Sequence, residues 1–223
     1  MTLQEAIHAR HSVRQYLEKP IEEEKLKQLQ TLIEECNQKG KLHIQLVVNE
    51  PKAFAGGMAK YGKFSGVSNY IAMICRKGEE TALGYYGEQI ILTAQTLGLN
   101  TCWVGLSFSN QRDQYQMESD EHLVCVVSLG YGANQGVQHP QKKTVADVTK
   151  TQGAAPDWFV RGAEAALLAP TAVNQQKFEF ILHENNRVEA KAKFSIIGYA
   201  AIDLGIAKCH FEIGAGKENF TWA

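Results

Sequence analysis

The strongest information about the fold is a repeated order of helix and strand. The spacing of apolar residues predicts a helix over 23–36 followed by a strand over 42–48, and the same order returns as a helix over 157–168 and a strand over 177–183. Few residues are shared between the two sets. A duplication inside the chain is therefore one interpretation, and ordinary α+β packing without duplication is the other.

The next elements also occur in both halves. The continuous apolar run NYIAMICR at 69–76 is typical of a strand covered on both faces, and a helix is predicted over 83–97. In the second half, a strand is expected over 188–193 and a helix over 197–213. The sequence therefore predicts two sets of helices and strands in the same order.

Between the two sets lies a further strand, predicted over 122–132, and then an extended connection over 133–153, which has few large apolar residues. Inside the predicted helices, Gly84-Tyr85 of the first half matches Gly198-Tyr199 of the second. This match favours duplication.

Charge and cysteine usage exclude several classes of function. The 223 residues carry a formal net charge of -1, so no overall field attracts nucleic acid or an acidic membrane. No stretch approaches the roughly 20 apolar residues that span a bilayer, and the first residues carry charges throughout, unlike a signal peptide. The five cysteines are scattered and form no CxxC pair, which predicts reduced, mostly buried thiols in a cytoplasmic protein, not a disulfide framework or a metal site.

The segment Arg10-His11-Ser12-Val13-Arg14-Gln15-Tyr16 is a candidate phosphate site. It places two guanidinium groups, an imidazole and a hydroxyl at a helix end. A planar guanidinium binds phosphate oxygens in pairs, and a serine hydroxyl adds one more donor. A solvated basic helix end that balances the helix dipole is the alternative interpretation.

A second polar segment follows the predicted helix 157–168 and reads Leu168-Ala169-Pro170-Thr171-Ala172-Val173-Asn174-Gln175-Gln176-Lys177-Phe178. Pro170 ends the helix, and hydroxyl and amide side chains follow in a loop before a strand. Such a loop can offer several hydrogen bonds to a polar ligand. Simple turn chemistry, in which Asn and Thr are common, is the alternative.

A third segment, Leu97-Gly98-Leu99-Asn100-Thr101-Cys102-Trp103-Val104-Gly105, turns from a helix end into a buried stretch, where Gly105 would let a flat ring approach the backbone. A competing glycine-rich run, Gly130-Tyr131-Gly132-Ala133-Asn134-Gln135-Gly136, also follows a strand. Its spacing differs from the dinucleotide fingerprint, and Val137-Gln138-His139-Pro140 follows in place of a helix whose N-terminus could bind a pyrophosphate. The glycine-rich run is therefore interpreted as a strand exit.

Together, the three polar segments resemble the FMN-dependent nitroreductase family. The family's N-terminal RRSxRxF or RHS signature corresponds to residues 10–16, its A-P-S-A-x-N-x-Q-P-W loop to 169–178 and its GLGTxWxG turn to 98–105. Its tail R/K-K-P-L-E-x-V is echoed by Lys142-Lys143-Thr144-Val145-Ala146-Asp147-Val148. The resemblance covers nearly the whole chain, although Lys177-Phe178 replaces Pro-Trp.

The order of these motifs differs from that of ordinary members. There, the A-P-S-A-x-N loop follows the first long helix, where this chain reads Cys36-Asn37-Gln38-Lys39-Gly40-Lys41-Leu42. Ordinary members are homodimers in which each FMN takes its phosphate site from one subunit and the loop from the other. The resemblance therefore implies an intrachain pseudo-dimer. It also implies one FMN, because Gly153-Ala154-Ala155-Pro156-Asp157 carries no second RxS signature.

The expected fold class is α+β: a nitroreductase-like, central, mainly antiparallel sheet flanked by helices and built from two unequal halves. Residues 1–150 would form the first half with the FMN phosphate site, and residues 151–223 the shorter second half with the APTAVNQQ loop, in one compact unit. The helix 157–168 is expected to pack against first-half helices through Val160, Ala163, Leu167 and Leu168.

The resemblance also implies roles at the phosphate end of FMN. Arg10, His11 and Ser12 would bind the phosphate, and Lys142 or Lys143 would close the site.

Further residues would surround the rest of the cofactor. Arg14 would lie near the pyrimidine end of the flavin ring, and Lys63 near the ribityl chain and flavin O2. The remaining contacts to the ring or ribityl chain are assigned to Thr171, Ala172, Asn174, and the backbone N–H groups near Gly105 and Leu106.

The implied function is an FMN-dependent oxidoreductase that passes electrons from NAD(P)H through the flavin to a nitroaromatic, a quinone or a similar small-molecule acceptor. No catalytic side chain is named, since flavin N5 would carry the chemistry. Two alternatives stay open: a flavin-binding or redox-sensing protein without turnover, and a cofactor-free interaction module. NADH versus NADPH, and monomer versus weak homodimer, also stay open.

Overall fold

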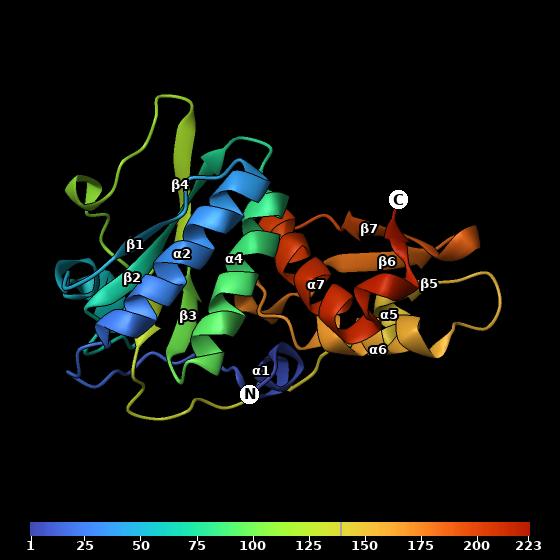
Figure 1. The fold of residues 1–223 in the computed structure, drawn as a ribbon, viewed down its shortest axis with the longest axis horizontal. Helices are drawn as coiled ribbons and strands as arrows, with labels where there is room; N and C mark the ends of the chain where they lie inside the picture. Colours follow the sequence, from blue (N-terminus) through green and yellow to red (C-terminus); the bar gives the residue numbers. More distant parts are fainter. Residues whose placement is uncertain (139) are drawn as a thin grey trace.

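The computed structural model describes residues 1–138 and 140–223, and its strands form two four-stranded sheets (Figure 1). The first sheet has the order β1-β2-β4-β3, and all neighbouring strands are antiparallel. Its strands are β1 (Gln45–Val47), β2 (Asn69–Arg76), β3 (Asn100–Val104) and β4 (Glu121–Gly130). The long helices α2 (Glu23–Gly40) and α4 (Glu80–Thr96) pack together over one face of this sheet.

The second sheet is built by the last third of the chain and has the order β5-β6-β7-β8. The central strands β6 and β7 are antiparallel, whereas each outer strand pairs in parallel. Its strands are β5 (Thr149–Lys150), β6 (Phe178–Leu182), β7 (Arg187–Ala192) and β8 (Thr221–Trp222). The helices α6 (Asp157–Leu167) and α7 (Ala200–Ala215) pack against each other, and α7 contacts β6 and β7.

Aromatic packing joins the second sheet to its helices. Phe178 and Phe180 are two residues apart on β6 and are both fully buried, as expected for side chains on the same face of a strand. The ring of Phe180 stacks on Phe211 of α7 with centroids 4.4 Å apart. Burying an aromatic side chain of this size stabilises the fold by about 1.5–3 kcal/mol.

Helices α4 and α7 lie side by side at the centre of the molecule, one from each half (Figure 1). A Cβ atom on Gly84 would lie 2.1 Å from the carbonyl oxygen of Ile202, and one on Gly205 would lie 2.0 Å from that of Thr81. The two contacts are reciprocal, because Thr81 and Ile202 each stand three residues before the glycine of their own helix. Only glycine allows this close approach of two backbones.

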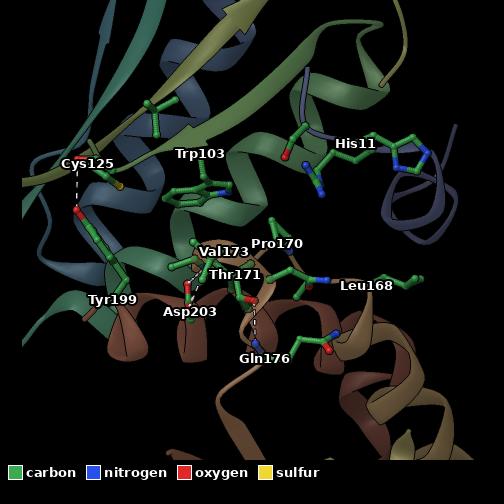
Figure 2. Close-up of a pocket in the computed structure, with 18 of the residues that line it drawn as sticks. His11, Trp103, Cys125, Leu168, Pro170, Thr171, Val173, Gln176, Tyr199 and Asp203 are labelled. Carbon is green, nitrogen blue, oxygen red and sulfur yellow. Dashed lines mark hydrogen bonds between the residues drawn. The ribbon is translucent and has the colours of Figure 1, made fainter. Parts of the chain in front are cut away.

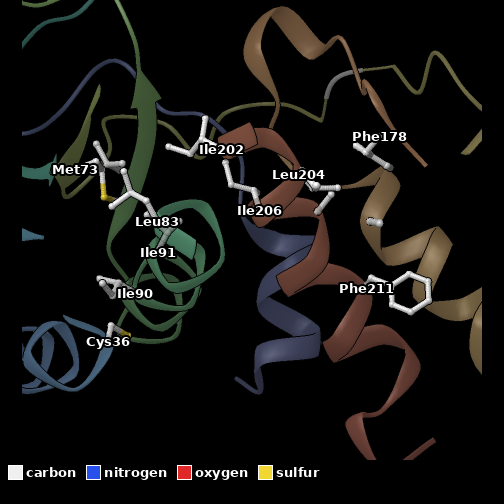
Figure 3. Packing of buried hydrophobic residues seen from close by; sticks show 14 of the residues in the cluster. Cys36, Met73, Leu83, Ile90, Ile91, Phe178, Ile202, Leu204, Ile206 and Phe211 are labelled. Atoms are coloured by element: carbon white, nitrogen blue, oxygen red, sulfur yellow. The ribbon is translucent and has the colours of Figure 1, made fainter. Parts of the chain in front are cut away.

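The largest hydrophobic cluster continues through this helix pair (Figure 3). On the first-half side it includes Met73 of β2 and Ile91 of α4, and on the second-half side Ile206 and Phe211 of α7. All four side chains are buried. The two sheets with their helices therefore share one core.

The fold is α+β with an antiparallel sheet flanked by helices, as the sequence predicts, although two separate sheets replace the single sheet expected. The prediction for the last helix is wrong at its start. Gly198 and Tyr199 have positive φ angles of 79° and 61°, which a right-handed helix does not include, so α7 begins at Ala200. Across the helix pair, Gly205 and not Gly198 is the counterpart of Gly84.

Two further predictions need correction. The connection over 133–153 is not wholly extended, since it contains β5 and the short helix α5 (Val145–Val148). Helix α6 packs chiefly against α7 and much less against first-half helices, and its Val160 is only half-buried. Its Ala165 joins a small cluster with Ala6 and Leu92 of first-half helices, and Leu168 packs against that cluster.

The other helices are short: α1 (Leu3–Ala9), α3 (Gly57–Tyr61) and several single 3₁₀ turns. Within the described residues, no helix combines the length and the apolar character that crossing a membrane requires. All five cysteines are buried, and each is a free thiol.

Candidate functional site

A cavity of about 790 Å³ opens between the first sheet and the start of α7 (Figure 2). Four segments that lie far apart in the sequence contribute to its walls, within 10–14, 103–107, 167–176 and 197–206. The three polar segments identified in the sequence therefore meet around one space, and they do so within a single chain.

The N-terminal segment is fixed to the first sheet. A capping box between Thr2 and Glu5 starts α1, and the backbone becomes extended at Arg10, where the helix ends. The segment then runs beside β3, with a bridge between Ser12 and Thr101 and a hydrogen bond from the N–H of Val13 to the carbonyl oxygen of Thr101 at 3.0 Å. This pairing holds Arg10 and Ser12 at the cavity wall.

Arg10 is buried, with 6% of its surface exposed, and lines the cavity. Its Nε lies 3.7 Å from a carboxylate oxygen of Glu88 on α4, close enough for an ion pair but too far for a hydrogen bond. Within the described chain, its Nε and Nη1 atoms are buried without any hydrogen-bond partner. Buried donors of this kind are costly unless a ligand satisfies them.

Glu88 is fully buried, and its carboxylate hydrogen-bonds to side chains on two other elements. One carboxylate oxygen lies 2.9 Å from Nε2 of His210 on α7, and the other accepts a hydrogen bond of 2.8 Å from the indole N–H of Trp103 on β3. Nδ1 of His210 lies 3.1 Å from the carbonyl oxygen of Ala165 on α6. Trp103 itself lines the cavity (Figure 2).

The loop after α6 has an unusual backbone. Val173, Asn174 and Gln176 all have positive φ angles, of 46°, 53° and 48°. For a β-branched residue such as Val173 this conformation is strained, and strain of this kind is concentrated at functional sites. The hydroxyl of Thr171 accepts a hydrogen bond from the N–H of Gln176 at 3.0 Å, which closes the loop.

Asp203 on α7 fixes the same loop through hydrogen bonds. Its two carboxylate oxygens accept from the N–H of Ala172 at 3.0 and 3.1 Å, and one also accepts from the side-chain amide of Gln175 at 2.7 Å. Burial raises the pKa of Asp203 to about 6, although the bonds from Gln175 and Ala172 lower it. Sequence reasoning misses this residue, because its partners are about 30 positions away.

Tyr199 also enters the cavity from the second half (Figure 2). Its hydroxyl donates to the carbonyl oxygen of Gly105 at 3.3 Å, and a Cβ atom on Gly105 would lie 2.7 Å from that hydroxyl. The ring of Tyr199 therefore lies on the side of Gly105 where a side chain would stand. In the structure, the space left by the missing side chain of Gly105 is therefore filled by the ring of Tyr199.

All but one of the remaining predicted site residues line the cavity. His11, Arg14, Lys63, Leu106 and Lys142 line the cavity together with Thr171, Ala172 and Asn174. Lys143 does not line it: its ammonium group donates to the carbonyl oxygen of Gln176. Burial is the first cause of a lowered pKa of Lys143, followed by repulsion from Lys193 and Lys177.

The part of the chain that the structure describes contains one group of three possible metal ligands. Atoms of Cys75, Glu80 and His122 lie within 4.8 Å of one another. None of the three lines the cavity, and two of them are partly exposed. The cavity therefore offers polar and cationic groups, with no cluster of metal ligands among its described residues.

The antiparallel sheet with flanking helices, and the cavity between an N-terminal arginine segment and a strained polar loop, place the chain among proteins with the nitroreductase fold. Residues 2–215 match the model of the family described as "Putative TM nitroreductase". The chain belongs to this family. None of the curated proteins compared with the chain matches it.

Two solved structures with TM-scores of 0.69 and 0.50 support the same fold. A nitroreductase from Thermotoga maritima superposes with a TM-score of 0.69 at 21% identity, covering 98% of this chain and 85% of that one. A protein from Parabacteroides distasonis, described as an NADH dehydrogenase/NAD(P)H nitroreductase, has a TM-score of 0.50 at 17% identity over 66% of this chain and 95% of that one. A nitroreductase from Desulfovibrio desulfuricans, solved with FMN, has a TM-score of 0.47 at 15% identity, with coverages of 66% and 94%.

Proposed function

We propose that the chain is an FMN-dependent oxidoreductase that transfers electrons from NAD(P)H to a nitroaromatic, a quinone or a similar acceptor. The observation that carries this proposal is the buried guanidinium of Arg10, whose Nε and Nη1 find no hydrogen-bond partner within the described chain. A buried cation at a cavity wall fits a ligand with an anionic end, and the phosphate of FMN has the oxygens that such a group binds.

The residues present also fit the remainder of FMN. The chemistry that bound FMN would supply is electron transfer from a nicotinamide to an acceptor. Arg10, His11 and Ser12 would bind the phosphate, with Lys142 at the rim; Lys143 is the weaker candidate, because its ammonium group already serves Gln176. Arg14 would lie toward the pyrimidine end, where a cation favours the reduced ring.

The loop and the turn would orient the ring. Asp203 keeps Ala172 in place, so that the loop Thr171–Asn174 would contact the ring or the ribityl chain. Two further contacts to the cofactor are proposed. One is made by the backbone N–H groups near Gly105 and Leu106, and the other by Lys63, which also lines the cavity. Apolar side chains at the mouth would leave room for a flat acceptor; Leu106 is 72% exposed.

We further propose that the chain is a pseudo-dimer, with residues 1–150 and 151–223 as its two halves and with one FMN between them. The reciprocal glycine contacts of α4 and α7 support this proposal, since a two-fold relation produces such pairs. The presence of only one RxS segment, at 10–14, supports a single site.

The test is to measure FMN binding and turnover with the purified full-length protein. Oxidised flavin bound at one equivalent per chain, and its bleaching by NADH or NADPH, are expected. Flavin binding without bleaching by either nicotinamide would favour a redox-sensing protein. Failure to bind FMN would leave the cofactor-free interaction module, and two equivalents per chain would contradict the single shared site.

A further inference from the structure

The cluster of Arg10, Glu88, His210 and Trp103 lies beneath the phosphate end of the proposed site, and its hydrogen bonds fix its net charge. The four side chains come from the end of α1, from α4, from α7 and from β3. Glu88 and His210 are fully buried, and Arg10 is 6% exposed. Solvent screens the charges of such buried groups only weakly, so the number of protons that they hold matters for any ligand beside them.

The positions of the protons follow from which atoms can accept. The carbonyl oxygen of Ala165 can only accept, so Nδ1 of His210, at 3.1 Å, carries a hydrogen. The indole N–H of Trp103 can only donate, so the second oxygen of Glu88 accepts at 2.8 Å. Between Nε2 of His210 and the first oxygen of Glu88, 2.9 Å apart, one hydrogen must therefore lie.

This hydrogen allows two arrangements of the pair. Either His210 is an imidazolium facing an ionised Glu88, or His210 is neutral and accepts from a protonated Glu88. The pair is neutral overall in both arrangements. Arg10 adds one positive charge, because its guanidinium stays protonated in proteins, and the cluster therefore carries +1 wherever the hydrogen sits.

We infer that His210 and Glu88 are positioning residues that neutralise each other and so leave the charge of Arg10 available to an anion in the cavity. The inference rests on the proposed function for the identity of that anion, the FMN phosphate. Without the proton shared with His210, Glu88 would be a buried carboxylate 3.7 Å from Nε of Arg10 and would compete with the ligand for it. Trp103 would keep the carboxylate in place from the cavity wall.

Isosteric variants separate this role from simple packing. His210→Gln removes the shared proton and leaves a cluster of net charge zero, so the affinity for FMN should fall by about 10-fold or more. Glu88→Gln leaves Arg10 as the one charge, and the affinity should stay near that of the natural protein. The double variant also carries +1 and should restore the affinity lost in His210→Gln.

The measurement is fluorescence titration with FMN and, in parallel, with riboflavin, which has no phosphate. The loss in His210→Gln should appear with FMN and be absent with riboflavin. Equal losses in all three variants, or a double variant weaker than either single one, would show a structural role only and overturn the inference. If the natural protein does not bind FMN, the proposed function falls; the same variants are then compared by the rise in Tm that inorganic phosphate produces.

A second measurement detects the protons in the natural protein itself and needs a variant only to assign the signals. In the natural protein with ¹⁵N-labelled histidine, the ring nitrogens of His210 are assigned by comparison with His210→Gln or His210→Asn, whichever folds. A protonated Nδ1 and a hydrogen shared between Nε2 and Glu88 are expected. An unprotonated Nδ1 would overturn the inference directly.

Discussion

The hydroxyl of Tyr199 donates to the carbonyl oxygen of Gly105 at 3.3 Å, so the second half of the chain touches the turn of the first half inside the cavity. Gly105→Ala would place a methyl 2.7 Å from that hydroxyl and force the ring away. We expect a loss of about 1–3 kcal/mol in the free energy of unfolding, as for other overpacked sites, measured by urea unfolding.

Coupling between the two positions checks this explanation. In a Tyr199→Ala background, the same Gly105→Ala change should cost less, because the ring that it displaces is gone. Equal costs in both backgrounds would contradict the contact. Tyr199→Phe serves as the matched control, since it removes only the hydrogen bond and should cost about 0.5–1.5 kcal/mol.

Arg10→Ala should weaken FMN binding by about 10- to 150-fold, because it removes a charge-assisted hydrogen bond that contributes roughly 1.5–3 kcal/mol to binding. Titration with FMN measures the loss, and riboflavin should show little of it. Arg76→Ala is the control, because Arg76 is half-exposed, pairs with Asp120 and does not line the cavity. An unchanged FMN affinity in folded Arg10→Ala would remove Arg10 from the site.

Because of Asp203, the free energy of unfolding should fall as the pH rises from about 4 to above 6. Burial raises its pKa from 3.8 to about 6, so the folded protein binds this proton more tightly than the unfolded chain. Protonated Asp203 therefore adds to the free energy of unfolding. This contribution, roughly 3 kcal/mol, is fully present below pH about 4 and is lost as the pH rises through about 6. Urea unfolding across this range should show the decline, and Asp203→Asn should remove it; a parallel decline in the variant would assign the effect to another group.

The central helix pair should not tolerate a side chain at either glycine. Gly84→Ala or Gly205→Ala would bring a methyl about 2 Å from a carbonyl oxygen of the opposite helix, and we expect each to cost about 1–3 kcal/mol or more. The double variant should cost less than the sum of the two, because the first change already separates the helices. Thermal unfolding gives the comparison.

Gly57→Ala provides the control for the glycine changes. A Cβ atom on Gly57 of α3 would meet nothing within 4 Å, so this change should stabilise the protein by about 0.4–1 kcal/mol. A destabilisation as large as that of Gly84→Ala would mean that loss of glycine itself, and not the helix contact, explains the results.

The parts of the fold that the sequence predicts well are those with local patterns. The apolar run at 69–76 coincides with β2, and the helix predicted over 157–168 coincides with α6 to within one residue. Strands β5 and β8 have two residues each, too few to show an alternation, and they form by pairing with strands about 30 residues away. Local patterns carry no information on such pairs.

The same distinction applies to the candidate site. Arg10 and Thr171 belong to motifs that can be read from neighbouring letters, and both line the cavity. Glu88 and His210 stand 122 positions apart, and each looks like an ordinary helical residue until the helices are packed. The sequence pattern predicts Tyr199 inside a helix, whereas its position in the cavity depends on a positive φ angle that the neighbouring residues do not reveal.

Among the described residues, those that line the cavity come from both halves of one covalent chain, which pack together through α4 and α7. In a site made by two separate chains, dilution separates the partners and the binding site is lost with them. In this chain the two halves are covalently linked, so their association is intramolecular. Its effective concentration depends on the linker and does not change on dilution. Cofactor affinity should therefore be the same in nanomolar and in micromolar protein, and a cell could keep this protein at very low copy number without losing its site.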